Sequence, residues 1–410
     1  MTTCNRILIV VLLIMTSSLA GFATSSEDNS LSRLSDTDRQ LLNNAIELVD
    51  GGMAESALTD FDRLAKKYPK NYLIQYERLF ALYSLHRYDE VIKAQKQILK
   101  HKDVEEIAYQ LVGNSYDFTG ERKKAAEIYN EGLKHFPKSG KLYLELGNLS
   151  NLDKDYNKAL EYYNKGIIVD PNFASNYFQA SMLYLASEMG RPWGLVYAES
   201  EILLAPSNNN RHAVMAGKIV DCLRDAITIN LDGDSTRVSV KLVPTRNITI
   251  DEKTKTTYLA FPGVYEGIIS QPLLKMYLEK RPFTASLPQL IELRRGALEA
   301  YYSLTDNLYG NGMYLFEFQK KIIDAGHWEA YNYFLFEPVF TEEFDEWYAA
   351  HEEEMETFID WYNQAPYTLG DGRSVDPSQI YSSYRPLELM EATMIHASLL
   401  IDTKLRKAKE

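Results

Sequence analysis

Apolar positions in the first half of the chain recur with a helical period, and whole helix pairs recur at a longer, fixed interval. The segments AAEIYNEGLKHFP (125–137) and ALEYYNKGIIVDP (159–171) share one pattern of Ala, Tyr, Gly and Pro. The repeat interval is the distance from Pro137 to Pro171. Proline cannot donate the hydrogen bond of a helix interior, so each Pro marks a helix end. The pattern predicts five units of two antiparallel helices, at residues 38–71, 72–105, 106–139, 140–173 and 174–207.

Small and aromatic residues occupy fixed places within these units. The third unit has Tyr109, Gly113, Tyr116, Ala125, Tyr129, Gly132 and Pro137, and the fourth has Tyr143, Gly147, Ala159, Tyr163, Gly166 and Pro171. Small residues let two helices approach closely, and the aromatic rings fill the space between them. Residues 38–207 therefore resemble the tetratricopeptide repeat (TPR) family, whose units have this length and composition. The second of the five units matches less well, because Leu79, Val91 and Ile98 stand where the family pattern has small residues.

The resemblance implies a mostly α fold, an α-solenoid whose first helices line a concave face for a protein or peptide. The side chains that it places there are Tyr76, Phe80, Tyr83, Gln110, Asn114, Asp117, Phe118, Glu145, Asn148 and Phe178. Asn114 and Asn148 hold the same place in successive units, where an amide can bind a peptide main chain because it both donates and accepts. The alternative is a tolerated polar residue on a solvated face. The aromatic residues either stack on a ligand or pack against a neighbouring helix.

The periodicity changes after Ala226. The segment NNNRHAVMAGKIVDCLRDAI predicts a capping helix, which extends the solenoid to residues 38–226. Alternation in ITIN and RVSVKLV predicts a β-hairpin, and NITI with TTYLAF predicts a second one, within a small β element and linker at 227–272. Residues 273–410 form a predicted helical domain of no recognised type. It includes one long helix from Thr341 to before Pro366 and a final helix after Arg385.

The net charge restricts the class of partner, and the N-terminal sequence restricts the cellular compartment. The formal net charge is −13, which argues against nucleic acid because phosphate binding requires a basic face. Arg6, an apolar run and small residues ending at Ala23 predict a signal peptide at residues 1–23. We expect an exported protein, periplasmic or secreted, with an uncleaved anchor as the alternative. The mature chain would keep one cysteine, Cys222, in an apolar helical pattern that indicates a buried thiol.

The sequence predicts no catalytic residue, metal site or cofactor. His351-Glu352 begins like a metalloprotease motif, but Met355 stands where the second His is needed. Asp232-Gly233-Asp234 begins like a calcium loop but lacks the acidic residue at its twelfth position. His327, Trp328, His351 and His396 are available in the second half, but no spacing arranges them.

Three functions remain open. The first is a non-catalytic TPR scaffold of the bacterial cell envelope that binds a protein or peptide. The second is a glycan-binding envelope component, because the chain is rich in tyrosine, with 29 residues. The third is an enzyme with its site in residues 227–410.

Overall fold

A computed structural model describes residue 31 and residues 34–187, 190–230, 237–242, 248–251, 256–259, 261–305 and 313–369. The chain divides after Asp170 into two compact units. We call residues up to Asp170 the first unit and residues from Pro171 the second unit. The predicted signal peptide and the predicted final helix lie outside the described residues.

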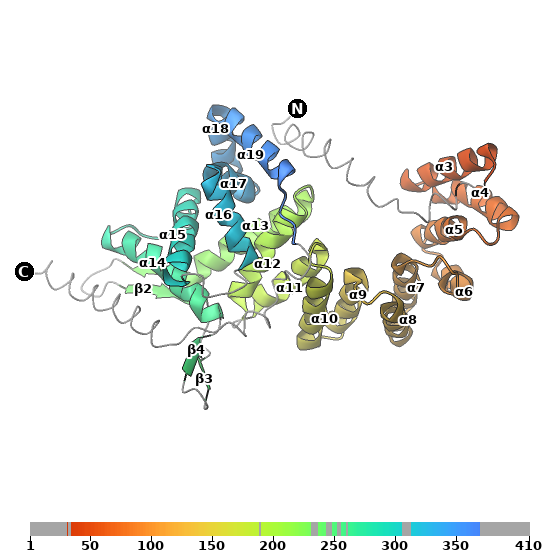
Figure 1. Ribbon diagram of the computed structural model, residues 1–410, viewed down its shortest axis with the longest axis horizontal. Coiled ribbons are helices and arrows are strands. Elements are labelled where there is room, and N and C mark those ends of the chain that lie inside the picture. The colour runs from red at the N-terminus through yellow and green to blue at the C-terminus, as the bar shows by residue number, and fades with distance from the viewer. Residues whose placement is uncertain are drawn as a thin grey trace, which may run out of the picture. The chain divides into compact units, whose positions relative to one another are not determined.

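The first unit consists of successive helix pairs, as Figure 1 shows. The pairs are α3 (Asp36–Asp50) with α4 (Ala54–Lys67), α5 (Tyr72–Ser84) with α6 (Tyr88–Leu99), α7 (Glu106–Phe118) with α8 (Arg122–His135), and α9 (Gly140–Leu152) with α10 (Tyr156–Val169). The first helices of neighbouring pairs, α3, α5, α7 and α9, pack side by side. The predicted helical repeat is confirmed over these residues.

The turn inside each pair repeats at the interval that the sequence shows. Gly52, His86, Gly120 and Lys154 all adopt positive φ, at 78°, 60°, 83° and 63°. The backbone N–H of each bonds to the carbonyl three residues earlier, and the next N–H bonds to the carbonyl five residues before it. This is the left-handed helix end that satisfies carbonyls left without intrahelical partners. Four turns of one geometry at one spacing show that the pairs are structural repeats.

Glycine permits the close contact between the two helices of a pair. A Cβ at Gly113 would lie 2.1 Å from Cε1 of Tyr129, and one at Gly147 would lie 2.3 Å from Cε1 of Tyr163. Tyr129 and Tyr163 are almost fully buried. The tyrosine ring of each second helix therefore lies directly on the glycine backbone of its first helix.

The second unit begins with the fifth predicted pair, α11 (Ala174–Ala186) and α12 (Arg191–Leu204), followed by α13 (Asn209–Ala226). Every residue of α12 from Pro192 to Leu203 is buried. A helix that is buried all round lies inside a core. The predicted solenoid of residues 38–226 thus runs across the division between the units, and α12 is a central helix of the second one.

Both predicted hairpins are present. Strands β1 (Ile227–Asn230) and β2 (Arg237–Val240) are antiparallel, with Ile227 opposite Val240. Strands β3 (Ile248–Asp251) and β4 (Thr256–Leu259) pair with Ile248 opposite Leu259. The candidate calcium loop at Asp232 lies outside the described residues.

Helices complete the second unit: α14 (Phe261–Leu278), α15 (Leu287–Thr305), α16 (Tyr314–Asp324), α17 (Trp328–Phe336), α18 (Thr341–Ala350) and α19 (Glu352–Gln364). The return to helix at Leu273 was predicted too late, because α14 starts at Phe261 and carries Pro272 in its interior. Gly326, between α16 and α17, has φ of 83° and the same paired turn bonds as the repeats of the first unit.

The single long helix predicted from Thr341 was wrong. The backbone breaks at His351 (φ −134°, ψ 31°), whose Nδ1 lies 2.8 Å from the carbonyl oxygen of Trp347. Phe340 is the N-cap residue of α18. The apolar side chains of this segment are buried on both sides of the break, at Phe344, Trp347, Tyr348, Met355, Phe358, Ile359 and Tyr362. The break at His351 leaves the same face of the chain buried, so the apolar pattern of the sequence does not reveal it.

Candidate functional site

Two separate sets of hydrogen bonds connect three successive repeats of the first unit, one between the second and third repeats and one between the third and fourth. In the first set Tyr83 on α5 bonds Asn114 on α7. In the second set Gln110 on α7 and Asn148 on α9 both bond Glu145 on α9. These are five of the ten residues that the repeat pattern predicted. We call the surface that these five side chains form, together with the neighbouring Asp117 and Phe118, the first-helix face.

The two asparagines are held in one orientation by tyrosines from the second helices. The Tyr129 hydroxyl donates to Oδ1 of Asn114 at 2.5 Å, and the Tyr163 hydroxyl donates to Oδ1 of Asn148 at 3.0 Å. Because a phenol and an amide oxygen pair in both repeats, the NH₂ group of each asparagine is turned to the first-helix face. Two donors thus occupy the same position of successive repeats, on adjacent first helices.

Glu145 is the shared acceptor of the second set of hydrogen bonds. Gln110 Nε2 donates to its Oε1 at 2.7 Å, and Asn148 Nδ2 donates to its Oε2 at 3.1 Å. Asn114 also hydrogen-bonds the Tyr83 hydroxyl. Burial raises the pKa of Tyr129 and of Tyr163, and the nearby charge of Glu145 adds to both effects. The carboxylate therefore lies close to the rings that fix the asparagines.

The predicted aromatic residues of α5 and α7 pack in two groups, and Tyr88 of α6 joins the second group. Ring centroids are 6.3 Å apart for Tyr76 and Phe80, 6.2 Å for Tyr83 and Phe118, and 4.9 Å for Tyr88 and Phe118. Tyr76, Phe80 and Tyr83 are partly buried against the core, but Phe118 is 61% exposed. The packing interpretation thus describes most of these rings, whereas Phe118 offers an apolar surface to solvent.

The remaining predicted residues have other surroundings. Asp117 lies 3.5 Å from Nε of Arg122. Phe178 belongs to the second unit, where its ring lies 4.8 Å beneath the Arg211 guanidinium. The structure therefore places Phe178 apart, with a partner of its own, and brings five predicted residues together in two hydrogen-bonded sets: Tyr83 with Asn114, and Gln110 and Asn148 with Glu145.

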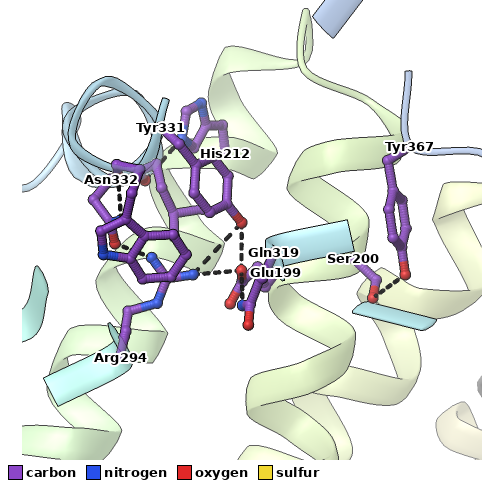
Figure 2. Close-up of polar contacts among 10 residues, drawn as sticks. Glu199, Ser200, His212, Arg294, Gln319, Tyr331, Asn332 and Tyr367 are labelled. Carbon is purple, nitrogen blue, oxygen red and sulfur yellow. Dashed lines mark hydrogen bonds and ion pairs between the residues drawn. The ribbon is translucent and has the colours of Figure 1, made fainter. Parts of the chain in front are cut away.

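The second unit contains a buried charged cluster that the sequence analysis missed. Figure 2 shows Arg294 of α15, Gln319 of α16 and Tyr331 of α17 converging on Glu199 of α12. All three donate to Oε1 of Glu199, with Gln319 at 2.5 Å. Arg294 also donates to Asn332, and its guanidinium lies 5.2–5.4 Å from the ring centres of Trp328, Tyr331 and Phe336. The only sequence signal was acidic residues in the apolar run GLVYAESEILL.

A cavity of about 30 Å³ adjoins this cluster at Glu199, Arg294 and Gln319. Its other walls are mainly apolar, including Leu195, Ile219 and Phe316. Its volume suits a water molecule and excludes a metabolite. The cluster therefore joins four helices and does not form a substrate pocket.

Glu201 on α12 is a second buried carboxyl group of the second unit. It is 1% exposed, and among the described residues neither of its oxygens has a hydrogen-bond partner. Arg211 approaches to 3.9 Å. Burial raises the pKa of Glu201 to about 7, whereas burial lowers the pKa of His212 on α13 to about 4. As pH rises, Glu201 therefore lowers the free energy of unfolding, whereas His212 raises it.

Replacing Glu201 by glutamine should stabilise the protein increasingly as pH rises. Between the unfolded pKa of 4.5 and the folded pKa of about 7, the folded state holds a proton that the unfolded state has released. The contribution of Glu201 to the free energy of unfolding therefore falls as pH rises through this window, by up to about 3 kcal/mol. Urea unfolding at pH 5 and pH 8 should show the gain of Glu201→Gln mainly at pH 8, with Glu356→Gln on α19 as an exposed control. An equal gain at both pH values would contradict the assignment.

The catalytic candidates are not assembled. His327 packs against Phe358 and Trp361, and burial lowers its pKa. His351 stacks on Trp347 at 4.7 Å, and His396 lies outside the described residues. Burial raises the pKa of the half-buried Cys222 to about 11, which leaves it unreactive at neutral pH.

The described part of the chain presents neither a metal-binding group of side chains nor a membrane-spanning helix. No three His, Cys, Asp or Glu side chains there are grouped so that they could hold a metal ion. None of the helices that the structure describes combines the length and the hydrophobicity needed to span a bilayer.

The turns and the Gly–Tyr packing define residues 36–169 as a solenoid of TPR-type helical hairpins. No family model and no curated protein matches the chain. Among solved structures, TTC0263, a thermophilic TPR protein of Thermus thermophilus, is 17% identical over 45% of this chain and 99% of its own, with a TM-score of 0.38. MamA (residues 41 to the end) from Desulfovibrio magneticus RS-1 is 17% identical over 43% and 98%, at 0.34. YrrB, described as a TPR protein with an unusual peptide-binding site, is 16% identical over 42% and 88%, at 0.31.

Proposed function

We propose that the chain is an exported, non-catalytic scaffold of the bacterial cell envelope that binds an extended protein segment on its first-helix face. The observation that carries the proposal is the oriented pair Asn114 and Asn148. Their oxygens accept from Tyr129 and Tyr163, while the NH₂ group of Asn114 bonds Tyr83 and that of Asn148 bonds Glu145. Because an amide NH₂ group has two N–H donors, each asparagine retains one for a ligand. An extended main chain presents carbonyl acceptors in the open, and amide donors on adjacent helices can bind two of them.

Export rests on the sequence of residues 1–23 alone. The absence of catalysis is the expectation that follows from the scattered histidines and the inert thiol. The role of the second unit is proposed to be a capping or second partner-binding module.

The test is a peptide selection on the full purified chain. Random dodecapeptides displayed on phage are selected on the protein, and the best peptide is labelled for fluorescence anisotropy. Asn114→Ala and Asn148→Ala should each weaken binding roughly tenfold, because each removes a donor and also leaves a tyrosine hydroxyl without its acceptor. Asn130→Ala is the matched control, because Asn130 lies exposed on α8 and bonds only its own helix at Ala126. Failure to enrich any peptide, or equal affinity of all four proteins, would contradict the proposal.

A glycan ligand is the second candidate. It is favoured by the stacked pair Tyr88 and Phe118, whose rings are 15° from parallel, with Phe118 exposed. All four tryptophans, Trp193, Trp328, Trp347 and Trp361, belong to the second unit, so the test does not rely on their fluorescence. Calorimetry with cell-wall oligosaccharides on the wild type and on Phe118→Ala would reveal it.

A further inference from the structure

Glu145 differs from the other carboxylates of its surface in lacking a cation. Glu106 is paired with Lys141 at 2.8 Å, and Asp117 lies near Arg122 at 3.5 Å. Within the described part of the chain, no lysine, arginine or histidine nitrogen lies within 4.0 Å of the Glu145 carboxylate. Its partners are the neutral amides of Gln110 and Asn148.

The amides fix the carboxylate without neutralising it. An ionised carboxylate has about four acceptor positions on two oxygens, and the two amides use one position on each oxygen. One of the donors is itself held, because Asn148 is oriented by Tyr163. The Glu145 carboxylate is therefore held in place before a ligand binds, and its oxygens can still accept a hydrogen bond from a further donor.

The surroundings of Glu145 suit a cationic group. Tyr83, Tyr129 and Tyr163 all experience its negative charge. A charge-assisted hydrogen bond between an ammonium or guanidinium group and a carboxylate is stronger than a neutral one. An anionic terminus would instead meet the like charges of Glu145 and Asp117.

We propose that Glu145 determines specificity by binding a lysine or arginine side chain of the extended segment. Asn114 and Asn148 hold the main chain of that segment, and Tyr129 and Tyr163 act as positioning residues. The partner is thus a cationic peptide, with an apolar side chain available to the exposed ring of Phe118. This inference rests on the proposed function and adds the chemistry of the partner.

The experiment compares phage selections of random dodecapeptides on three full-length proteins. These are the wild type, Glu145→Gln, and the matched control Glu131→Gln, which changes an exposed carboxylate on α8. Lys and Arg should be enriched several-fold on the wild type and on Glu131→Gln. The enrichment should disappear on Glu145→Gln, although peptides are still selected there. Circular dichroism establishes that all three proteins are folded.

A direct measurement follows with the best wild-type peptide. Changing its Lys or Arg to norleucine should weaken binding to the wild type roughly tenfold, and should scarcely alter binding to Glu145→Gln. Selected peptides without enriched cations, or an equal loss on both proteins, would overturn the role of Glu145 and leave the peptide-binding proposal standing. If no peptide is enriched on the wild type, the proposed function itself fails, and the role of Glu145 fails with it.

Discussion

Replacing Arg294 by methionine is expected to destabilise the second unit by roughly 3–5 kcal/mol. The change would leave the Glu199 carboxylate buried with no counter-charge, since both side chains of the pair are about one-tenth exposed, at 10% and 9%. It would also remove the hydrogen bond to Asn332 and the contacts with three aromatic rings. Urea unfolding followed by tryptophan fluorescence measures the effect, because all four tryptophans lie in this unit.

The neighbouring residue provides the control for this prediction. Arg295 is adjacent on α15, and its side chain is 54% exposed and pairs with Glu299 at 3.3 Å. Arg295→Met should cost less than about 1 kcal/mol, as exposed pairs do. The double variant Glu199→Leu with Arg294→Met should lose less than the sum of the two single variants, since it leaves no charge unpaired. Equal effects at Arg294 and Arg295 would show that the buried cluster does not join the helices.

Replacing Gly113 by alanine is expected to destabilise the first unit by roughly 1–3 kcal/mol. In an open helix the same change would stabilise by about 1 kcal/mol, because alanine is the better helix former. Here the new Cβ would lie 2.1 Å from Cε1 of Tyr129, so the ring or the helix must move. The measurement is hydrogen exchange of the α7 and α8 amides in the full chain.

Gly217→Ala in α13 is the matched control, because a Cβ there meets nothing within 4 Å. It should stabilise its own helix, giving the opposite sign for the same substitution. Combining Gly113→Ala with Tyr129→Ala should cost less than the two changes added together, because the ring that clashes has been removed. A stabilising Gly113→Ala would contradict the close Gly–Tyr packing.

The helical repeats could be predicted because their requirements recur in the sequence at a fixed distance. Each helix pair that packs this closely needs a glycine under the tyrosine ring. Gly113 and Gly147 therefore hold the same place in successive repeats. The asparagine–tyrosine bonds also leave a signal, since each pair is separated by 15 residues in both repeats. The spacing alone does not reveal the bond, because the position of each hydroxyl is set by how the two helices pack.

The second unit offered no such recurrence. Glu199 and Arg294 are 95 residues apart, so nothing local marks them as partners. The start of α14 at Phe261 was missed because Pro262 and Gly263 favour a loop, and the tertiary contacts of α14 with α12 and α15 prevail over that preference. The interruption at His351 was missed because the apolar stripe continues through it.

The most direct test of the central claim is to locate the bound peptide on the full chain. The selected peptide carries a benzophenone at one end, and its photo-crosslinks are mapped by mass spectrometry. Binding on the first-helix face predicts crosslinks on α5, α7 and α9, around Tyr83, Phe118 and Asn148, that diminish in Asn148→Ala. Crosslinks confined to residues 171–369 would contradict the account, because the repeats of the first unit would then not be the binding surface.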